Sequence, residues 1–400
     1  HHRDRGGHAD HAGSYQGLAI VNKIASVNVA VVTGTRAEWG LLESVHDELI
    51  KKQAVRTDLV VTGAHLLPDV DTVSGITAPI SAKVVMQEPG QYGRSADAKA
   101  LGRGTEGLAS CFEDFQSHIV VVLGDRIEAF AAASAASVGG QILVHIHGGD
   151  RAEGVADEAM RHAITKLAHI HCCATEQSAE RVRRMGEKSG NVHITGSPAV
   201  AGLQTIEPIS EAKWSELCEP QAVIIHHGAG LEEEIERQTA NAIANSVRGR
   251  RTLWLRANND PGSETIDEVR DRFLRENQHV ARIDHLPRQE FVGTLKRLAA
   301  SEGVLIGNSS AALIECAALG VSAVNIGPRQ SGRERANNIV DLETDITSEK
   351  ITHAIEQAAA IDRSKMNHPY GDGDAAHRIS EVIANIDVSE KSLLRKRNIF

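Results

Sequence analysis

Short apolar runs alternate with helix-like segments along almost the whole chain, and this alternation restricts the fold more than any other feature. Each run is too short for a transmembrane helix and ends at a glycine or a polar residue. Strands that alternate with helices form βαβ units, so the strands lie parallel and helices cover both faces of the sheet. The predicted strands are residues 28–34, 58–63, 118–124, 141–149, 192–196, 222–228, 252–258, 280–286, 303–309 and 322–327.

The pattern divides into two series that join near residues 198–220, a segment with three prolines. We predict two Rossmann-like, doubly wound parallel-sheet domains at 26–200 and 201–385, between an N-terminal extension (1–25) and a basic tail (386–400). Ligands of such sheets bind beyond the carboxyl ends of the strands, so a cleft between the domains is the expected site. The predicted helices are residues 39–52, 97–115, 126–138, 157–168, 231–247, 263–276, 288–300, 310–319 and 349–361.

Composition argues against several classes of protein. The net charge of −10, from 43 basic and 53 acidic side chains, disfavours a surface that coats nucleic acid. No stretch approaches 18 apolar residues without a charge, so no membrane partner is expected. The five cysteines lack CxxC spacing, which disfavours a zinc site or a disulfide framework and indicates a reducing, cytoplasmic setting. The His-rich start has no apolar core and is not typical of a secretory signal.

Two motifs follow strands of the first half. TGTRAEWG (33–40) is a glycine-containing turn whose N–H groups, together with Arg36, could meet a phosphate. LGDRIEA (123–129) places Asp125 and Arg126 at the carboxyl end of a strand. An ordinary βα turn and a salt-bridged helix start are the alternative interpretations. The sequence contains neither GxGxxG nor GxxxxGK[ST], which disfavours dinucleotide binding and ATP hydrolysis.

A third motif, HIHGGDRAEGVADEAMRHAITKLAH (145–169), gathers histidines and carboxylates around a glycine turn. His145 and His147 share one face of a strand; His145 is compatible with a core role, whereas His147 is nearer the loop and the better cleft candidate. Asp150 follows in the turn. Asp157 lies on one helical face with the residues four and eight positions later. Because HExxH-like spacing is absent, a metal site is not favoured.

Two further motifs lie in the second half. In IGNSSAALIECAALG (306–320), Ser309 and Ser310 could cap a helix and bind an anion, and Glu315 could accept ribose hydroxyls. In NIGPRQSGRERANNIVD (325–341), three arginines, at 329, 333 and 335, could neutralise a diphosphate. Plain N-capping and a solvated basic loop are the alternatives.

Together, GTRAEWG, GDRIEA, HIHGGD, RHAITKLAH, NNDPGS, IGNSSAALIE and GPRQSGRE resemble the UDP-N-acetylglucosamine 2-epimerase family over about residues 27–385. The resemblance implies two Rossmann-like domains with the active site between them, as in GT-B glycosyltransferases. The Gly-Asp-Arg form and RHAITKLAH are similar to the hydrolysing branch. That branch converts UDP-N-acetylglucosamine and water into N-acetylmannosamine and UDP for sialic acid biosynthesis, and its relatives hydrolyse modified UDP-sugars of legionaminic-type pathways.

The resemblance also implies roles for individual residues. The UDP-binding residues it implies are Arg36, His226, Asn258, His285, Ser309, Ser310, Glu315 and Arg329. The residues it implies near the sugar are Glu38, Asp125, Arg126, Asp150 and Asp157. For the proton transfers we favour Asp125, Asp150 and His147. The chain has Asp150 where the family commonly has Glu, Glu38-Trp39 for Asp-Tyr and His226-His227 for His-Pro, so which histidine meets the phosphate stays open.

The implied reaction is elimination of UDP followed by hydration with inversion at C2, which requires neither a redox cofactor nor an obligatory metal. A homodimer or homotetramer is expected from the resemblance. The alternatives are a hydrolysing 2-epimerase of UDP-diacetamido-trideoxyglucose, a non-hydrolysing epimerase, a GT-B glycosyltransferase and a nucleotide-sugar-binding regulator without turnover.

Overall fold

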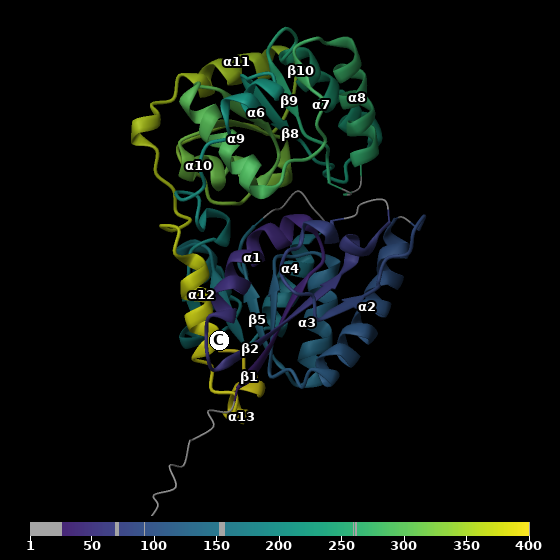
Figure 1. Ribbon diagram of the computed structural model, residues 1–400, viewed down its shortest axis with the longest axis vertical. Coiled ribbons are helices and arrows are strands. Elements are labelled where there is room, and N and C mark those ends of the chain that lie inside the picture. The colour runs from purple at the N-terminus through teal and green to yellow at the C-terminus, as the bar shows by residue number, and fades with distance from the viewer. Residues whose placement is uncertain are drawn as a thin grey trace, which may run out of the picture.

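The structure, a computed structural model, describes residues 26–68, 72–91, 93–151, 157–258, 260 and 262–399, without the side chain at 157. Two parallel sheets build two α/β domains, one above the other in Figure 1. The predicted doubly wound α/β fold is thereby confirmed. In the described part of the chain the first sheet has seven strands, in the order β3-β2-β1-β4-β5-β6-β7, and the second has six, in the order β10-β9-β8-β11-β12-β13.

The strands of the first sheet are β1 (Val27–Thr33), β2 (Val55–Thr62), β3 (Ala82–Val84), β4 (Ile119–Leu123), β5 (Ile142–Ile146), β6 (Ile170–Cys173) and β7 (Val192–Ile194). Those of the second are β8 (Ala222–Ile225), β9 (Thr252–Trp254), β10 (Val280–Ala281), β11 (Val304–Gly307), β12 (Ser322–Ile326) and β13 (Ile339–Leu342). In both sheets the first strand of the series lies between the second and the fourth. This order places the site-bearing strand ends of each sheet side by side.

Most of the predicted helices are present. The first domain contains α1 (Arg36–Ile50), α2 (Arg94–Asp114), α3 (Ile127–Gly139), α4 (Asp157–Leu167) and α5 (Glu176–Arg184). The second contains α6 (Glu211–Glu216), α7 (Glu233–Ser246), α8 (Ser263–Glu276), α9 (Arg288–Ala300), α10 (Glu315–Leu319) and α11 (Ser348–Ala359). Two more helices, α12 (Ala375–Ala384) and α13 (Lys391–Leu394), come after them. The sequence did not predict α5, α6, α12 and α13.

Strand β1 shows why the sheets are buried on both faces. Val29 and Val31 pack against α1, whereas Ala30 and Val32 point to the other face, among residues of α2 and α3. All four are buried, which fits an apolar strand covered by helices on both faces. The Ala-rich α3 contributes small side chains, so it lies close to the sheet.

The chain returns to the first domain after α11. Helix α12 packs on α1, as the yellow helix beside α1 in Figure 1 shows, although residues up to 385 were predicted with the second domain. The predicted basic tail is also ordered as far as residue 399. The ammonium group of Lys396 donates to the carbonyls of Thr165, Lys166 and Ala168, at 3.1, 2.6 and 2.6 Å. These carbonyls end α4 and have no partner within the helix, so Lys396 caps it.

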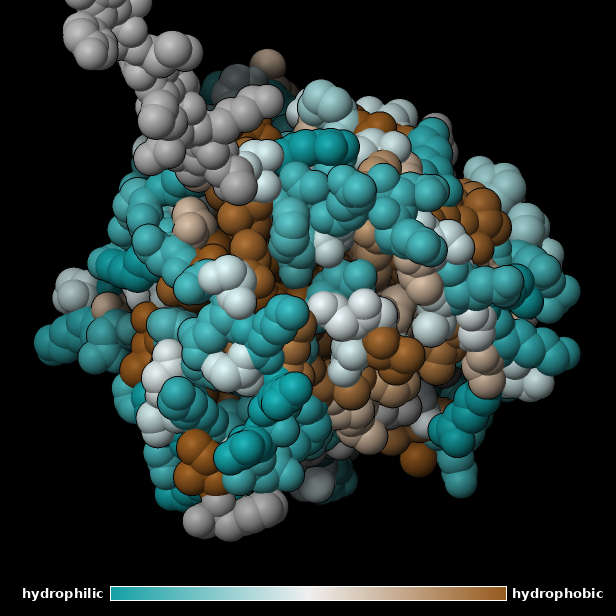
Figure 2. All heavy atoms as spheres, turned by 90° about the horizontal axis from the view of Figure 1, so that it is seen from below, coloured by the Kyte–Doolittle hydropathy of each residue, from teal (hydrophilic) through white to brown (hydrophobic). Residues whose placement is uncertain are grey.

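The surface carries no extended apolar region on the face drawn in Figure 2. Hydrophilic side chains cover most of that view, and hydrophobic ones lie between them in small groups. Within the described residues, no helix combines the length and the apolar character needed to cross a bilayer.

Candidate active site

The carboxyl ends of the two sheets face each other, and side chains from both domains meet there. Arg36 at the start of α1 lies with Nη2 2.7 Å from Nδ1 of His285, which follows β10. Arg126 donates from Nη1 to Oδ1 of Asp260 at 2.9 Å. These contacts join residues 249 and 134 positions apart. Candidate residues of both domains therefore gather where the sheets face each other, the place at which the sequence predicts a cleft.

A buried network at the end of β5 holds two of the predicted catalytic residues. Nδ1 of His147 lies 3.3 Å from Oδ2 of Asp150, and its Nε2 forms a 2.9 Å hydrogen bond with Oγ of Ser197. Ser178 donates to Oδ1 of Asp150 at 2.8 Å. Burial lowers the pKa of His147, which favours the neutral imidazole that can accept a proton. Asp150 and His147 thus form an oriented acid–base pair.

The turn between these residues is under backbone constraint. His147 has φ of 65°, in the left-handed region that a non-glycine residue seldom adopts. Gly149, with φ of 78°, approaches α5 so closely that a Cβ would lie 2.2 Å from the carbonyl oxygen of Ser178. The motif HIHGGD therefore needs glycine here, because any side chain would push Asp150 away from Ser178.

Asp125 is held by a buried arginine. Arg161 on α4 forms an ion pair with Asp125 and lies with Nη1 3.4 Å from the carbonyl of His147. His145 links the same elements, because its Nε2 bonds to the carbonyl of Gly124 at 2.8 Å and its Nδ1 to Oγ1 of Thr165 at 3.1 Å. Burial lowers the pKa of His145 to about 3, so it is a neutral core histidine. Asp157 has no described side chain, so its predicted role lies outside the described residues.

Glu38 serves the turn of the first motif. Its Oε2 accepts hydrogen bonds from the N–H groups of Gly34 and Thr35, at 2.7 and 3.1 Å, and completes a capping box with Thr35. The N–H groups that the sequence offered to a phosphate are thus already occupied. Burial and then the charge of Glu128 raise the pKa of Glu38 to about 8. A contact between Glu38 and a sugar stays a prediction, because the side chain is buried.

Arg126 and Arg329 come from different domains and share one carboxylate. Arg329 lies with Nη2 3.1 Å from Oδ2 of Asp260, whose Oδ1 faces Arg126. Burial raises the pKa of Asp260, but the two arginines more than offset this and lower it overall. Two guanidinium groups on either side of one anion form a site that suits a diphosphate.

The structure distinguishes His226 from His227. Burial and the charge of Arg329 lower the pKa of both to about 3, but only His227 is also influenced by Asp260 and Arg126. Nδ1 of His227 accepts the N–H of Asn258 at 3.0 Å. Adjacent residues at a strand end point to opposite sides. Both histidines thus lie near Arg329, and His227 lies nearer Asp260 and Arg126 as well. Which of them meets a phosphate stays open, and the UDP-binding role of His226 stays a prediction. Asn258 contacts His227 through its backbone N–H.

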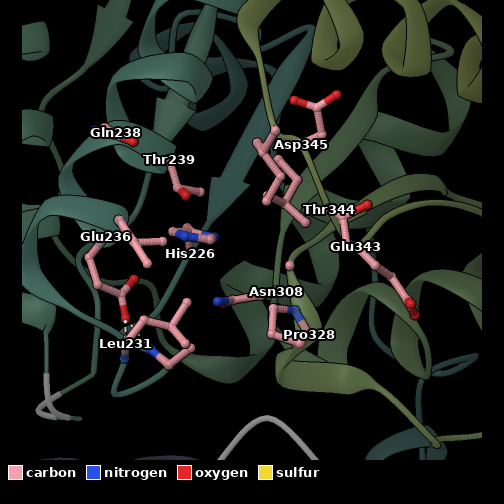
Figure 3. Close-up of a pocket in the computed structure, with 15 residues that line it drawn as sticks. His226, Leu231, Glu236, Gln238, Thr239, Asn308, Pro328, Glu343, Thr344 and Asp345 are labelled. Carbon is pink, nitrogen blue, oxygen red and sulfur yellow. Dashed lines mark hydrogen bonds between the residues drawn. The ribbon is translucent and has the colours of Figure 1, made fainter.

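His226 also lines a cavity of about 380 Å³ in the second domain (Figure 3). The cavity lies between α7 and the segment that follows β13. Oε1 of Glu236 accepts hydrogen bonds from the N–H groups of Ala229 and Leu231, at 2.7 and 3.3 Å. This glutamate occupies backbone donors that a phosphate could otherwise use before α7. The cavity adjoins the candidate active site, because Asn308 lines it and the Asn308 carbonyl accepts a hydrogen bond from Nη1 of Arg329 at 3.3 Å.

The predicted helix 310–319 is two shorter pieces. Residues Ser310–Ala312 form a 3₁₀ turn capped by Oγ of Ser309, which accepts the N–H of Ala311 at 3.3 Å, and α10 begins only at Glu315. Because such short helices align few peptide dipoles, the structure does not support the stabilisation of an anion by one long helix at this position. Ser309 and Ser310 still follow the carboxyl end of β11. Burial raises the pKa of Glu315, although Arg288 opposes this from 3.7 Å.

The three arginines of the loop after β12 have different partners. Arg329 binds Asp260, Arg333 approaches Asp150 to 3.9 Å, and Arg335 pairs with Asp341 at 3.0 Å within its own domain. Arg335 is therefore not part of a diphosphate site. Arg333, predicted to neutralise a diphosphate, lies instead near Asp150. The residues that we did not predict from the sequence, although they contact the candidate acids and arginines, are Arg161, Ser178, Ser197 and Asp260. No group of three His, Cys, Asp or Glu side chains suited to a metal occurs within the residues described.

Fold and site define a two-domain α/β protein whose facing sheets bring a histidine–carboxylate network against arginines. A family model described as UDP-N-acetylglucosamine 2-epimerase matches residues 47–384, and the chain belongs to this family. It is 32% identical over 386 residues to the hydrolysing UDP-N,N'-diacetylbacillosamine 2-epimerase of Legionella pneumophila, covering 93% of this chain and 99% of that protein. It is 28% identical over 367 residues to a UDP-N-acetylglucosamine 2-epimerase of Neisseria meningitidis, covering 89% and 95%.

Solved structures agree with the fold. The UDP-GlcNAc 2-epimerase of Methanocaldococcus jannaschii, solved with UDP-GlcNAc and UDP, superimposes with a TM-score of 0.76 at 17% identity, over 89% of this chain and 99% of that one. A Staphylococcus aureus MnaA structure with UDP gives 0.75 at 17% identity, over 94% and 100%. At this identity the likeness supports the two-domain architecture.

Proposed function

We propose that the chain is a hydrolysing 2-epimerase that converts UDP-N-acetylglucosamine and water into UDP and N-acetylmannosamine. One observation carries the proposal: where the two domains meet, the first domain holds the buried Asp150–His147 pair, which Arg333 of the second domain approaches, and Arg126 and Arg329 flank the carboxylate of Asp260. An acid–base pair opposite a cationic site matches a reaction that removes a proton from one sugar carbon and expels a diphosphate from the next.

The first step breaks the C2–H and C1–O bonds of the sugar. Asp150 takes the proton as the base: Oδ1 is fixed by Ser178, and Oδ2 accepts no hydrogen bond from any described residue. UDP leaves with the C1–O electron pair, and a C1–C2 double bond forms. Hydroxide from water then adds to C1, and a proton adds to the opposite face of C2, which inverts C2. His147, neutral and joined to Ser197, is placed to exchange protons with that water.

Departure of UDP builds negative charge on the diphosphate. Arg126, Arg329 and Arg36 supply positive charge around the cleft, and the buried His227 lies beside them. Asp260 occupies the place between two of these arginines, so a diphosphate would share or replace its contacts. Fixed cationic donors lower the barrier because they need no reorganisation as the charge develops.

A second substrate is favoured by one comparison. The Legionella pneumophila relative acts by its name on UDP-N,N'-diacetylbacillosamine and hydrolyses it, and it shares 32% identity with this chain over nearly its full length. We therefore extend the proposal to a UDP-linked 2,4-diacetamido-trideoxy sugar as the alternative substrate of the same site.

The test is product analysis by NMR in D₂O with each UDP-sugar separately. We expect free UDP and a free sugar that is inverted and deuterated at C2. A retained UDP-sugar with inverted C2 would show a non-hydrolysing epimerase. Turnover only with an added acceptor would indicate a glycosyltransferase, and binding without turnover a regulator; each of these results would contradict hydrolysis. D150N is the matched control because it keeps the shape of the side chain and removes the base.

A further inference from the structure

The loop after β12 reaches both halves of the cleft. Arg329 stays in its own domain beside Asp260, whereas Arg333, four residues later, crosses to the first domain. Nη2 of Arg333 lies 3.9 Å from Oδ2 of Asp150, and its Nε donates to the carbonyl of Arg151 at 3.3 Å. Its side chain is only 7% exposed, so the approach to Asp150 is a buried one.

The neighbouring residue fastens this loop to the first domain. Oε1 of Glu334 accepts a hydrogen bond from Thr175 at 3.1 Å and lies 2.9 Å from Nη1 of Arg181. The hydroxyl of Tyr370 donates to the Glu334 carbonyl at 2.7 Å. Thr175 is the N-cap of α5, the helix that also carries Ser178. The position of Arg333 is thus set by the same helix that orients Asp150.

Asp150 requires a charged partner at this point. It is 1% exposed, and Ser178 contacts only its Oδ1. At Oδ2 the neighbours are His147, at 3.3 Å, and Arg333. Burial favours the neutral form of His147, so the permanent positive charge facing this oxygen is the guanidinium of Arg333. A buried carboxylate without such a partner is unfavourable.

We propose that Arg333 is a positioning residue for Asp150: the second domain supplies the cation that orients the base of the first domain, so that the base is complete only when the two domains are closed. This inference rests on the proposed function. The loop after β12 would then link the two halves of the reaction, because it carries Arg329 beside the leaving group and Arg333 beside the base.

The experiment compares turnover with UDP affinity in R333A, R333Q and R335A. For R333A and R333Q we expect kcat to fall by about 10²-fold, the effect of a misplaced reacting group. Calorimetry should give a UDP Kd within about twofold of wild type, since Arg329 is retained. R335A loses the ion pair with Asp341 and the hydrogen bonds to the carbonyls of Gln330 and Arg333, so it reports the effect of a loosened loop alone, and its kcat should stay well above that of the Arg333 variants. Guanidinium chloride should restore part of the R333A activity, whereas sodium chloride of equal ionic strength should not.

Three results would overturn the inference. The first is a wild-type kcat in both Arg333 variants, and the second is a loss of UDP affinity as large as the loss of kcat. The third is a loss of kcat in R333A that guanidinium chloride does not relieve, although the variant melts at the wild-type temperature. R333Q retains most of the side-chain volume, so a loss in R333A alone would indicate packing and also contradict it. If wild-type protein itself does not hydrolyse either UDP-sugar, the proposed function fails and this inference fails with it. An active wild type with unaffected Arg333 variants refutes the inference alone.

Discussion

The two domains share a strand order but differ in the chemistry at their strand ends. In the first domain β5 leads into His147 and Asp150, which depend on hydrogen bonds to serines. In the second domain the loop after β12 presents Arg329, and β8 leads into His227. In the proposed reaction one fold therefore supports two tasks, proton transfer in the first domain and charge stabilisation in the second, and the difference lies in the residues placed on it.

The turn after the first strand of each series has the same feature in both domains. After β1 the backbone N–H groups of Gly34 and Thr35 bind Glu38, and after β8 those of Ala229 and Leu231 bind Glu236. In both domains a glutamate of the following helix occupies the donors that a phosphate would otherwise use. The lack of a GxGxxG fingerprint fits this arrangement. In the proposed reaction the diphosphate is therefore bound by side chains.

The strongest test of the division between domains is D150N. We expect kcat to fall by about 10²–10⁴-fold, the range for loss of a general base. The UDP Kd should stay close to wild type, because the arginines and His227 remain in place. Steady-state kinetics and calorimetry measure the two quantities. A parallel loss of UDP affinity would show that Asp150 is part of the leaving-group site and would remove the distinction.

R329A tests the second domain and should behave differently. We expect kcat to fall by about 10²–10³-fold, as when one donor to a developing anion is removed. In contrast to D150N, UDP binding should weaken as well, because the same guanidinium faces bound and departing diphosphate. R335A, from the same loop, is the control. Full turnover in R329A would exclude Arg329 from leaving-group stabilisation.

The sequence predicted the parts of this arrangement that are local. Strand β4 is an uninterrupted apolar run, and β1 and β5 are mostly apolar; all three were predicted. The sequence did not predict β3, which has three residues, β6, which carries a histidine and two cysteines, or β13, which is a half-exposed edge strand. Asp150 and His147 were candidates because they come soon after a predicted strand, and the structure places them in contact; their catalytic role stays a prediction.

The contacts that complete the site join residues far apart in the sequence, and no sequence pattern predicts them. Ser178 and Ser197 meet Asp150 and His147 from 28 and 50 residues away. Asp260 was part of a recognised motif, yet its two arginines lie 134 and 69 residues away. The choice between His226 and His227 stays open for a different reason: adjacent residues near a strand end point to different sides, and the sequence does not show which side faces the other domain.

K396A would test whether the segment after the second domain supports the first. Lys396 caps α4, which carries Arg161, and it also lies 2.9 Å from the buried Glu187. We expect the free energy of unfolding to fall by about 1–3 kcal/mol, because three carbonyls and a carboxylate lose a donor. Chemical denaturation measures this, and R397A, an exposed neighbour, is the control. If both variants unfold like wild type, the tail does not stabilise α4.

The smallest expected effect concerns the two capping glutamates. Burial and then Glu128 raise the pKa of Glu38 from 4.5 to about 8, and burial raises the pKa of Glu236 by less. A carboxyl group whose pKa is higher in the folded state stabilises the protein fully below its unfolded pKa. That contribution is lost as the pH rises through the folded pKa. For Glu38 the loss extends from about pH 4.5 to about pH 8.

E38Q should therefore gain stability relative to wild type between about pH 5 and about pH 9, because glutamine cannot ionise while its oxygen still accepts the two N–H groups. E236Q should change in the same direction by less, since burial alone raises the pKa of Glu236, without a neighbouring carboxylate. Denaturation at several pH values measures both differences. If the difference in the free energy of unfolding between E38Q and wild type does not change with pH in this range, Glu38 is already ionised in the folded protein. E128Q should reduce the E38Q effect, because it removes the neighbouring charge that helps to raise the pKa of Glu38.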